Sequence, residues 1–324
     1  MQQVVVERFG GPEVLAVQEV PKPVAGPGEV AVSVRAADVL WVETMVRRGN
    51  GKPHFPQVPP FVPGNAVVGH VLQVGDGVDP GWVGRAVATG TGGTGGYAEL
   101  VAVPVAGLVP VPDGVEIPDA AALLHDAVTA LALFELTQIT SDDTVLVVGA
   151  SGGLGIVSVQ LAKAREARVI AIARDERKLA RVRQLGADAV IDSEAPEWVR
   201  EARAAVGCHG ADVVLDNIGG AVGEAAFTLV APGGRFSAHG TPSSRFAAVD
   251  PEEATRRDVT LSGIADVQLS GEDYRRLTAQ ALAEAAAGRI TPVIGQTYPL
   301  EKAADAHAGI EARTVFGKSL LLVE

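Results

Sequence analysis

A glycine-rich turn between two apolar segments is the clearest candidate for chemistry in this sequence. The stretch consists of Val145–Val148, then Gly149, Gly152, Gly153 and Gly155, then apolar residues at helical spacing in Ile156–Leu161. Where a strand leads through such a turn into a helix, the glycines let the backbone approach a pyrophosphate, and the amides of the helix N-terminus face its charge. Glycines also serve ordinary turns, but the flanking strand and helix favour dinucleotide binding.

The chain after this turn alternates between strand and helix patterns. Asp175–Leu185 predicts a helix with Asp175 as its N-cap and Gly186 at its end. Further strands are expected at Arg168–Ala173, Ala189–Ile191, Asp212–Asp216, Gly234–Ser237 and Val259–Ile264. Together with Val145–Val148 they predict an α/β fold with a doubly wound parallel sheet and right-handed crossovers.

Residues 1–110 have a different pattern. Short β-type runs alternate there with glycine and proline, which predicts a compact, mostly antiparallel β domain. A helical pattern begins near Pro118 and runs through Ala120–Leu136. Near the end of the chain we expect helices at Glu272–Gly288 and Ala303–Ala312, and a last strand, Lys318–Val323, that returns to the N-terminal domain.

Composition narrows the classes of function. The 324 residues are 47% hydrophobic and 20% charged, which fits two globular domains with large cores. The net charge of −12 argues against nucleic acid or an anionic membrane surface as the main partner. Cys208 is the only cysteine, which excludes intramolecular disulfides and a cysteine-based zinc cage. Because no signal-like start and no apolar run of about 18 residues is present, we expect a cytoplasmic enzyme without a membrane segment.

An ordered set of short motifs covers nearly the whole chain. They are Gly28–Val30, Gly64–Gly69, Gly84–Val87, Gly96–Glu99, Val128–Ala130, Leu185–Asp188, Asp212–Asp216, Gly233–Arg235 and Gly317–Lys318, together with the glycine turn. In this order and spacing the chain resembles the zinc-independent medium-chain dehydrogenases/reductases, in particular the quinone oxidoreductase family.

The resemblance implies a domain organisation. A Rossmann domain at residues 125–266 would be inserted in a GroES-like, mostly-β catalytic domain formed by residues 1–124 and 267–324, with the active site in the cleft between them. Family members usually form homodimers through the last edge strand of the Rossmann sheet, here Val259–Ile264. An unpaired strand edge favours such pairing, because its donors and acceptors are unsatisfied.

No metal site is expected. Zinc-dependent relatives carry a cysteine in the first lobe and Gly-His-Glu where this chain has Gly64, Asn65 and Ala66, and no cysteine precedes Cys208. A catalytic zinc needs three protein ligands of N, S or O type, which these positions cannot supply. His70, beside an apolar strand, is interpreted as a structural residue.

The end of the second strand of the sheet indicates NADPH as the cofactor. NAD-binding folds carry an acid there, and NADP-binding folds carry a cation. The strand ends at Ala173 and Arg174 follows, while Asp175 is better explained as a helix cap. Lys178 matches the family's lysine that reaches the 2′-phosphate, and a guanidinium with an ammonium suits a phosphate dianion. The alternative is that both are solvated surface cations.

Other cofactor contacts follow from the family pattern, and all except Thr129 lie in the glycine turn or near the ends of strands. They are Thr129, Ala150, Ser151, Gly152, Gly153, Leu154, Ser193, Asn217, Ile218, Gly240, Thr241 and Ile264. Thr129 is expected by the nicotinamide or the phosphates, and Ser193 stands where relatives often have a phosphate-contacting tyrosine. Ile264 is expected to end the sixth strand.

The expected catalytic loop, residues 40–49, departs from the family pattern. Relatives have asparagine and tyrosine where this chain has Leu40 and Met45. These changes suggest a pocket lined by Trp41 and Met45, with His125 as a polar handle. An unperturbed histidine pKa lies near neutrality, so His125 could protonate an enolate. Pairing of His125 with Asp126 at a helix start is the structural alternative.

Hydride transfer itself needs no general base, because the reduced nicotinamide supplies the hydride and the protein aligns the reactants and stabilises the oxyanion. We therefore expect an NADPH-dependent reductase of a quinone or an activated alkene, such as an α,β-unsaturated carbonyl. Within the same chemistry the alternative is an enoyl-thioester or polyketide-tailoring reductase, with Arg47, Arg48 and Lys52 at a cationic entrance. Outside it, the alternative is a non-catalytic NADPH-binding sensor or structural protein. Glu43 is expected to hold the loop rather than to react.

Overall fold

The computed structural model describes the whole chain, Met1–Glu324, and divides it into two compact units. The first unit comprises Met1–Val128, Leu269–Gly288 and Pro292–Glu324, and the second comprises Thr129–Gln268 and Arg289–Thr291. The second unit is therefore inserted in the sequence of the first. The first boundary falls after Val128 rather than after Leu124, so His125 belongs to the first unit.

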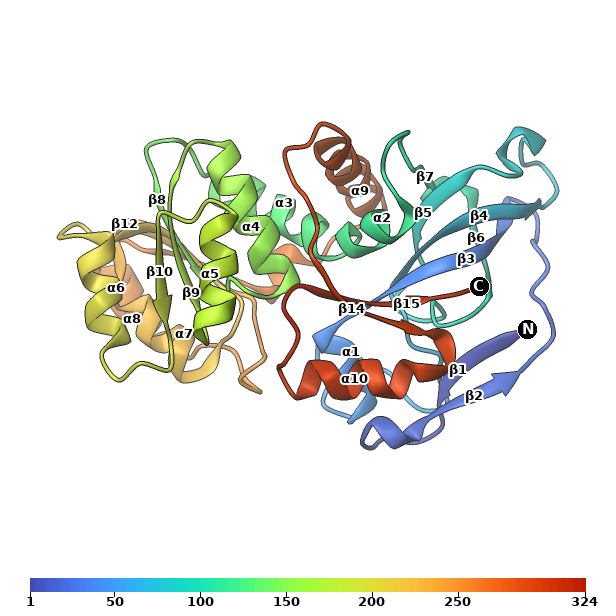
Figure 1. Ribbon diagram of the computed structural model, residues 1–324, viewed down its shortest axis with the longest axis horizontal. Coiled ribbons are helices and arrows are strands. Elements are labelled where there is room, and N and C mark those ends of the chain that lie inside the picture. The colour runs from blue at the N-terminus through green and yellow to red at the C-terminus, as the bar shows by residue number, and fades with distance from the viewer. The chain divides into compact units, whose positions relative to one another are not determined.

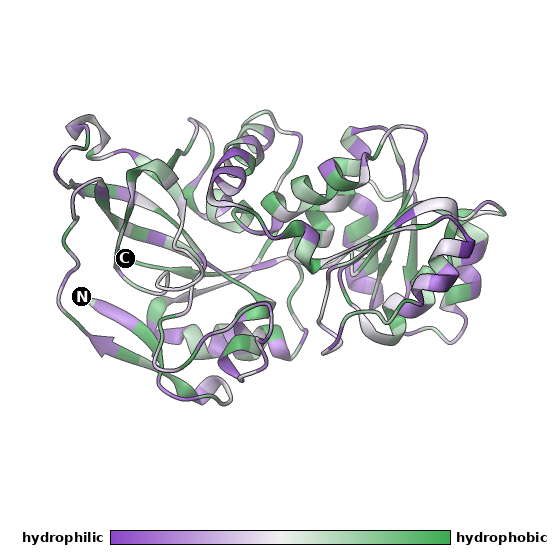
Figure 2. Ribbon diagram, turned by 180° about the vertical axis from the view of Figure 1, so that it is seen from behind, coloured by the Kyte–Doolittle hydropathy of each residue, from purple (hydrophilic) through white to green (hydrophobic).

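The second unit is built on a six-stranded parallel sheet with the strand order β10-β9-β8-β11-β12-β13. The strands are β8 (Thr144–Val148), β9 (Arg168–Ala173), β10 (Ala189–Asp192), β11 (Ala211–Asp216), β12 (Val230–Ala238) and β13 (Thr260–Gly263). The predicted doubly wound sheet is thus confirmed. In Figure 2 its strands are mainly green, the colour of hydrophobic residues, because central strands of a parallel sheet are buried on both faces.

One helix leads into β8, and five others connect the strands. They are α3 (Asp126–Thr137), α4 (Gly153–Ala164), α5 (Glu176–Gln184), α6 (Trp198–Val206), α7 (Gly220–Phe227) and α8 (Pro251–Arg256). The predicted cap of α5 is confirmed, because Asp175 Oδ1 accepts a hydrogen bond of 3.0 Å from Lys178 N. The expected single helix through Ala120–Leu136 is wrong: it is broken at Leu124 and His125 into two helices bent by 42°.

The first unit contains a seven-stranded, mostly antiparallel sheet with the order β14-β15-β3-β4-β5-β7, in which β6 also pairs with β3, and a separate hairpin of β1 and β2. The strands are β1 (Gln2–Val6), β2 (Leu15–Glu19), β3 (Glu29–Val39), β4 (Ala66–Val74), β5 (Ala86–Gly90), β6 (Leu100–Pro104), β7 (Val109–Pro110), β14 (Ile294–Pro299) and β15 (Lys318–Leu322). The last strand returns to this unit as expected, and it pairs with β3 (Figure 1).

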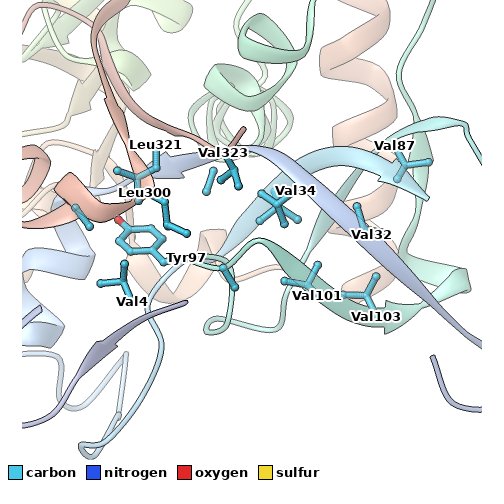
Figure 3. Packing of buried hydrophobic residues seen from close by; sticks show 14 of the residues in the cluster. Val4, Val32, Val34, Val87, Tyr97, Val101, Val103, Leu300, Leu321 and Val323 are labelled. Carbon is cyan, nitrogen blue, oxygen red and sulfur yellow. The ribbon is translucent and has the colours of Figure 1, made fainter. Parts of the chain in front are cut away.

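Four helices belong to the first unit: α1 (Trp41–Arg47), α2 (Ile117–Leu123), α9 (Gly271–Ala286) and α10 (Ala303–Glu311). Alternate residues of the strands form its core, where Val32 and Val34 of β3 and Val101 and Val103 of β6 point inward (Figure 3). Tyr97 is fully buried in the same cluster. Its hydroxyl is therefore obliged to find a hydrogen-bond partner inside the unit.

Two segments differ from their expected structure. Residues 41–47, expected as a loop, form α1, because Glu43 Oε2 accepts a hydrogen bond of 2.9 Å from Leu40 N and caps the helix start. β13 ends at Gly263, and Ile264 begins a 3₁₀ turn instead of ending the strand. No single helix is both long and apolar enough to cross a membrane; only the bent pair α2 and α3 reaches that length and hydropathy together.

Candidate active site

The glycine turn leaves β8 at the centre of the parallel sheet. Gly149 has a φ of 74°, in the left-handed region that side chains disfavour. A Cβ on Gly155 would lie 2.4 Å from Gly149 O, so only glycine lets α4 pack this closely against the turn. Gly152 is the N-cap of α4 and offers no side-chain cap. The first amides of α4 are therefore available to an anion.

Two cations follow β9, the neighbour of β8. Arg174 comes directly after the strand, and its Nη1 lies 3.5 Å from Glu194 Oε1. Lys178 lies in the first turn of α5 with its side chain 12% exposed, and burial lowers its pKa while Asp175 raises it. Because Asp175 is engaged in capping α5, the groups at this strand end that could contact a ribose phosphate are cationic.

The other expected cofactor contacts lie mostly just beyond the carboxyl ends of the strands. Ser193 follows β10 and donates a hydrogen bond of 3.2 Å to Ala173 O. Ile218 lies against the glycine turn, since a Cβ on Gly149 would stand 2.8 Å from Ile218 Cδ1. Gly240, after β12, packs so tightly that a Cβ there would stand 1.9 Å from the carbonyl carbon of Asn217.

The remaining predicted positions are distributed as follows: Ala150 and Ser151 in the turn, Gly153 and Leu154 at the start of α4, Thr241 after β12, and Thr129 within α3. The carboxyl ends of parallel strands meet at one edge of a sheet, which is where a dinucleotide binds in doubly wound folds. The second unit therefore gathers the turn, the cations and the strand-end residues at one edge.

In the first unit, Glu43 joins α1 to the sheet. Its carboxylate accepts hydrogen bonds from Leu40 N at 2.9 Å, Gly64 N at 3.0 Å and the Tyr97 hydroxyl at 2.7 Å. Burial, assisted by the charge of Asp38, raises the pKa of Glu43 to about 7. These three donors satisfy the carboxylate, which holds the start of α1 in place as expected.

The same network continues through a buried histidine. His307 Nε2 lies 3.1 Å from the Tyr97 hydroxyl, and His307 Nδ1 lies 3.0 Å from Arg47 Nη1. Since Arg47 can only donate, Nδ1 is the acceptor and Nε2 carries the proton. Burial lowers the pKa of His307 to about 3, which keeps the ring neutral. Arg47 is itself fully buried and forms an ion pair with Glu311.

A second buried polar cluster lies beside His125. Lys318 Nζ is 3.1 Å from Asp126 Oδ2 and 3.3 Å from Asp38 Oδ2. Burial opposes the charge of Lys318, but Asp126 and Asp38 outweigh it and raise its pKa. The expected alternative of Asp126 pairing with His125 is therefore replaced by a pair with Lys318. Burial, and then the charge of Lys318, lower the pKa of His125, so its ring is neutral near pH 7.

The two apolar pocket candidates lie on α1. Trp41 and Met45 are half-buried, whereas Leu40 before them is buried. The guanidinium of Arg313 stands 5.8 Å from the centre of the Trp41 ring. Trp41 Nε1 is buried without a hydrogen-bond partner. The first unit thus presents two large side chains on α1, of which Trp41 has an unused donor.

Family models match two stretches of the chain. Residues 26–113 match the alcohol dehydrogenase GroES-like domain, and residues 153–284 match the zinc-binding dehydrogenase family. The curated quinone oxidoreductase of Sus scrofa is 32% identical over 100% of this chain and 98% of its own length. The chain belongs to the quinone oxidoreductase family of medium-chain dehydrogenases/reductases. The resemblance inferred from the motifs is confirmed, and so is the GroES-like fold of the catalytic domain.

Further relatives and structurally similar proteins are named for different substrates or cofactors. The 2-haloacrylate reductase of Burkholderia sp is 29% identical over 98% of each chain. A mycobacterial protein solved in complex with NADPH is 30% identical, with a TM-score of 0.90 over 99% of this chain and 100% of its own. A protein described as an NAD-dependent alcohol dehydrogenase is 32% identical, with a TM-score of 0.89 over 100% of both chains. Similarity alone therefore does not distinguish NADPH from NADH as the cofactor, and the residues of the site must be considered.

One of the matching family models is named for zinc binding, so we looked for residues that could bind zinc in this chain. Asn65 and Ala66 stand where zinc-dependent relatives have histidine and glutamate. Across residues 1–324, no group of three or more His, Cys, Asp or Glu side chains is arranged to hold a metal ion.

A surface groove of about 570 Å³ lies elsewhere on the second unit. It is lined by residues that include Arg203, Phe227, Val230 and Arg257, and Val230 begins β12. The groove thus lies at the amino ends of the strands, opposite the edge that carries the glycine turn. Its position does not suit a dinucleotide bound in the manner of this family.

Sequence reasoning missed several polar residues. No motif surrounds His239, which stands two residues after Ser237, just beyond the end of a predicted strand. In the sequence, Lys318 belongs to the Gly317–Lys318 motif and begins a strand, but nothing marks it as the partner of two carboxylates. For His307 no local signal exists, because its partners Arg47 and Tyr97 lie far away in the sequence.

Proposed function

We propose that this protein is an NADPH-dependent, metal-independent oxidoreductase that transfers hydride to a quinone or to an activated alkene. The observation that carries the proposal is the glycine turn after β8 with Arg174 and Lys178 beyond the adjacent β9. The names of the relatives support both acceptor classes, since they include quinone oxidoreductases and a 2-haloacrylate reductase.

The residues of the turn fit the diphosphate of a dinucleotide. The close approach at Gly155 and the uncapped start of α4 leave backbone amides as donors. Ser151, Gly153 and Leu154 would hold the diphosphate through such amides, whereas Ala150 N and Gly152 N already donate to Ile172 O and Gly149 O and would shape the turn. When bound, the reduced nicotinamide supplies the hydride.

Arg174 and Lys178 would select NADPH over NADH. A guanidinium and an ammonium can both donate to a 2′-phosphate, whereas a ribose hydroxyl is best received by a carboxylate. Asp175 is occupied by the cap of α5 and would not serve this role. Removing the cations should therefore cost NADPH affinity and spare NADH.

On the catalytic domain, Trp41, Met45 and His125 would contact the substrate. Because its ring is neutral near pH 7, His125 would donate a hydrogen bond to the substrate oxygen on which negative charge develops, rather than act as a charged acid. Such a donor stabilises the transition state more than the ground state. The two apolar side chains suit a substrate with a planar, unsaturated carbon framework.

The enoyl-thioester alternative loses support from the placement of Arg47. This side chain is fully buried and paired with Glu311, so it cannot form part of a cationic entrance. Arg48 is exposed but also contacts Glu311, at 2.7 Å. A non-catalytic NADPH-binding role stays the second candidate, because Leu40 and Met45 replace polar family residues.

We further propose a homodimer through the edge of the parallel sheet, the segment Val259–Ile264. β13 is the last strand in the order, so one side of its backbone is unpaired. Leu261 on this strand is 38% exposed. Sedimentation of the wild-type chain should give a dimer, and Leu261→Lys should shift it toward the monomer.

Turnover and coenzyme preference test the proposal together. The wild-type chain should oxidise NADPH with at least one member of a panel of quinones, enones and haloacrylates. Arg174→Ala combined with Lys178→Ala should weaken NADPH binding by about tenfold to a hundredfold, since two charge-assisted hydrogen bonds are lost, and leave NADH binding within about twofold. Arg177→Ala, on the same helix, is the control. Tight NADPH binding without turnover on any acceptor would favour the non-catalytic candidate.

A further inference from the structure

A chain of hydrogen bonds links three side chains at the carboxyl ends of β11 and β12. His239 Nδ1 lies 3.0 Å from Ser237 Oγ, and His239 Nε2 lies 2.7 Å from Asn217 Oδ1. Asn217 Nδ2 in turn donates to Val148 O at 2.8 Å, at the end of β8. The chain therefore runs across the ends of three adjacent strands.

The directions of these bonds are fixed by the last one. Because Asn217 Nδ2 donates to a carbonyl, its Oδ1 can only accept, so His239 Nε2 carries the proton. Nδ1 of His239 then has no hydrogen and accepts from the Ser237 hydroxyl. Both Ser237 and His239 are buried, with exposed fractions of 0% and 7%. The ring is thus held as one neutral tautomer, in agreement with burial lowering the pKa of His239 to about 4.

Asn217 is the open end of this chain. It is half-buried, unlike the two residues behind it, and its Cβ would stand 3.4 Å from a Cβ placed on Gly149. One hydrogen of its amide is bonded to Val148 O, which leaves the second hydrogen of Nδ2 as a donor beside the glycine turn. His239 and Val148 O together hold this orientation, because a flipped amide would set Nδ2 against the Nε2 proton and Oδ1 against the carbonyl.

The strand order indicates which half of a dinucleotide would meet Asn217. β9 and β10 lie on one side of β8, and β11, β12 and β13 lie on the other. A dinucleotide bound at this reversal places one nucleotide on each side. Arg174 and Lys178 follow β9, on the side assigned to the 2′-phosphate, so Asn217 lies on the side of the nicotinamide nucleoside.

We propose that His239 is a positioning residue that orients Asn217 to donate a hydrogen bond to an oxygen of the nicotinamide nucleoside. This inference rests on the proposed NADPH function and adds a residue to it. Burying an imidazole costs free energy that an apolar side chain at this position would avoid. Orienting the Asn217 amide explains why a histidine stands here.

The test compares NADPH with 2′-phospho-ADP, which lacks the whole nicotinamide nucleoside but keeps the 2′-phosphate and the diphosphate. His239→Phe and Asn217→Ala should each weaken NADPH binding by about five- to thirtyfold, the effect of one hydrogen bond, and leave 2′-phospho-ADP binding within about twofold. The double variant should bind NADPH no more weakly than Asn217→Ala alone, because His239 acts through Asn217. His239→Gln, which keeps a donor, should recover part of the affinity. His209→Phe, at an exposed histidine of the same unit, is the control.

Equal losses for both ligands in His239→Phe and Asn217→Ala would show a general effect on the sheet edge and would overturn the inference. Additive losses in the double variant would also overturn it. If His239→Phe does not fold, Asn217→Ala and His239→Gln retain the same comparison of ligands. Failure of the wild-type chain to bind NADPH would overturn the proposed function and this inference with it, whereas wild-type binding with unchanged variants would overturn the inference alone.

Discussion

His307 in the first unit and His239 in the second are both buried and neutral, and both have a hydrogen-bond partner at each ring nitrogen. The His307 chain ends at one side on the buried Glu43, and at the other it runs through Arg47 to Glu311, which also pairs with Arg48, so each end meets protein partners. The chain through His239 ends instead on the half-buried Asn217, beside the glycine turn. A closed network holds segments together, whereas a network with one open end presents an oriented group to a ligand.

The largest expected effect comes from breaking the closed clusters of the first unit. Lys318→Met should lower the free energy of unfolding by about 3–5 kcal/mol, because it leaves the buried carboxylates of Asp38 and Asp126 without their cation. Urea denaturation measures this. Lys302→Met is the control, since Lys302 is exposed and only 3.7 Å from Asp305, and it should change stability by less than about 0.5 kcal/mol.

If Lys318→Met instead kept its stability and lost turnover, the cluster would act in catalysis. The contrast between structural polar clusters in the first unit and a ligand-orienting one in the second would then be wrong.

A smaller effect is expected for Tyr97→Phe. It removes the donor to Glu43 and the acceptor for His307, and leaving these buried groups unsatisfied should cost about 1–3 kcal/mol. The NADPH dissociation constant, measured below the melting temperature, should stay within about twofold. Tyr298→Phe, which removes only a half-buried bond to Gln296, should cost less. A large loss of NADPH affinity in Tyr97→Phe alone would contradict a purely structural role for the network.

A third effect, of a size similar to that of Tyr97→Phe, is a pH dependence that both histidines share. Their folded pKa values, about 3 for His307 and about 4 for His239, lie below the ordinary 6.5, so the unfolded chain binds more protons between these values. Stability should therefore rise as pH increases toward 6.5 and be lost on acidification, by up to about 1.4 kcal/mol per pH unit for each group. Glu43, with its pKa raised from 4.5 to about 7, acts in the opposite sense.

Denaturation of His307→Gln and His239→Gln at pH 4.5 and pH 6.5 checks this: each variant should show a smaller gain than wild type between the two values. An unchanged gain in both variants would mean that neither ring is held neutral.

Much of the fold could be predicted because its signals are local. The buried run of β8, the glycine turn and the Asp175 cap are each encoded within a few residues. β14 escaped prediction because it contains Gly295 and alternates between half-buried and exposed residues, with no fully buried position. α1 escaped because its cap relies on Glu43 binding Leu40 N, while the N-cap residue itself is apolar.

The polar clusters could not be predicted for a different reason. Lys318 meets Asp38, and Arg47 meets His307, only after distant strands and helices have packed, and no periodicity marks such pairs. The Ser237–His239 pair is the exception, since the two residues are only two positions apart, one at the end of β12 and the other directly after it. Asn217 joins it only through the parallel pairing of β11 with β12.

Hydrogen–deuterium exchange with and without NADPH tests the central claim most directly, that the backbone amides after Val148 hold the diphosphate. We expect the largest protection in peptides covering residues 149–163, with a smaller effect at Arg174–Lys178. Protection confined to the groove lined by Arg203 and Arg257, or no protection anywhere at saturating NADPH, would contradict it.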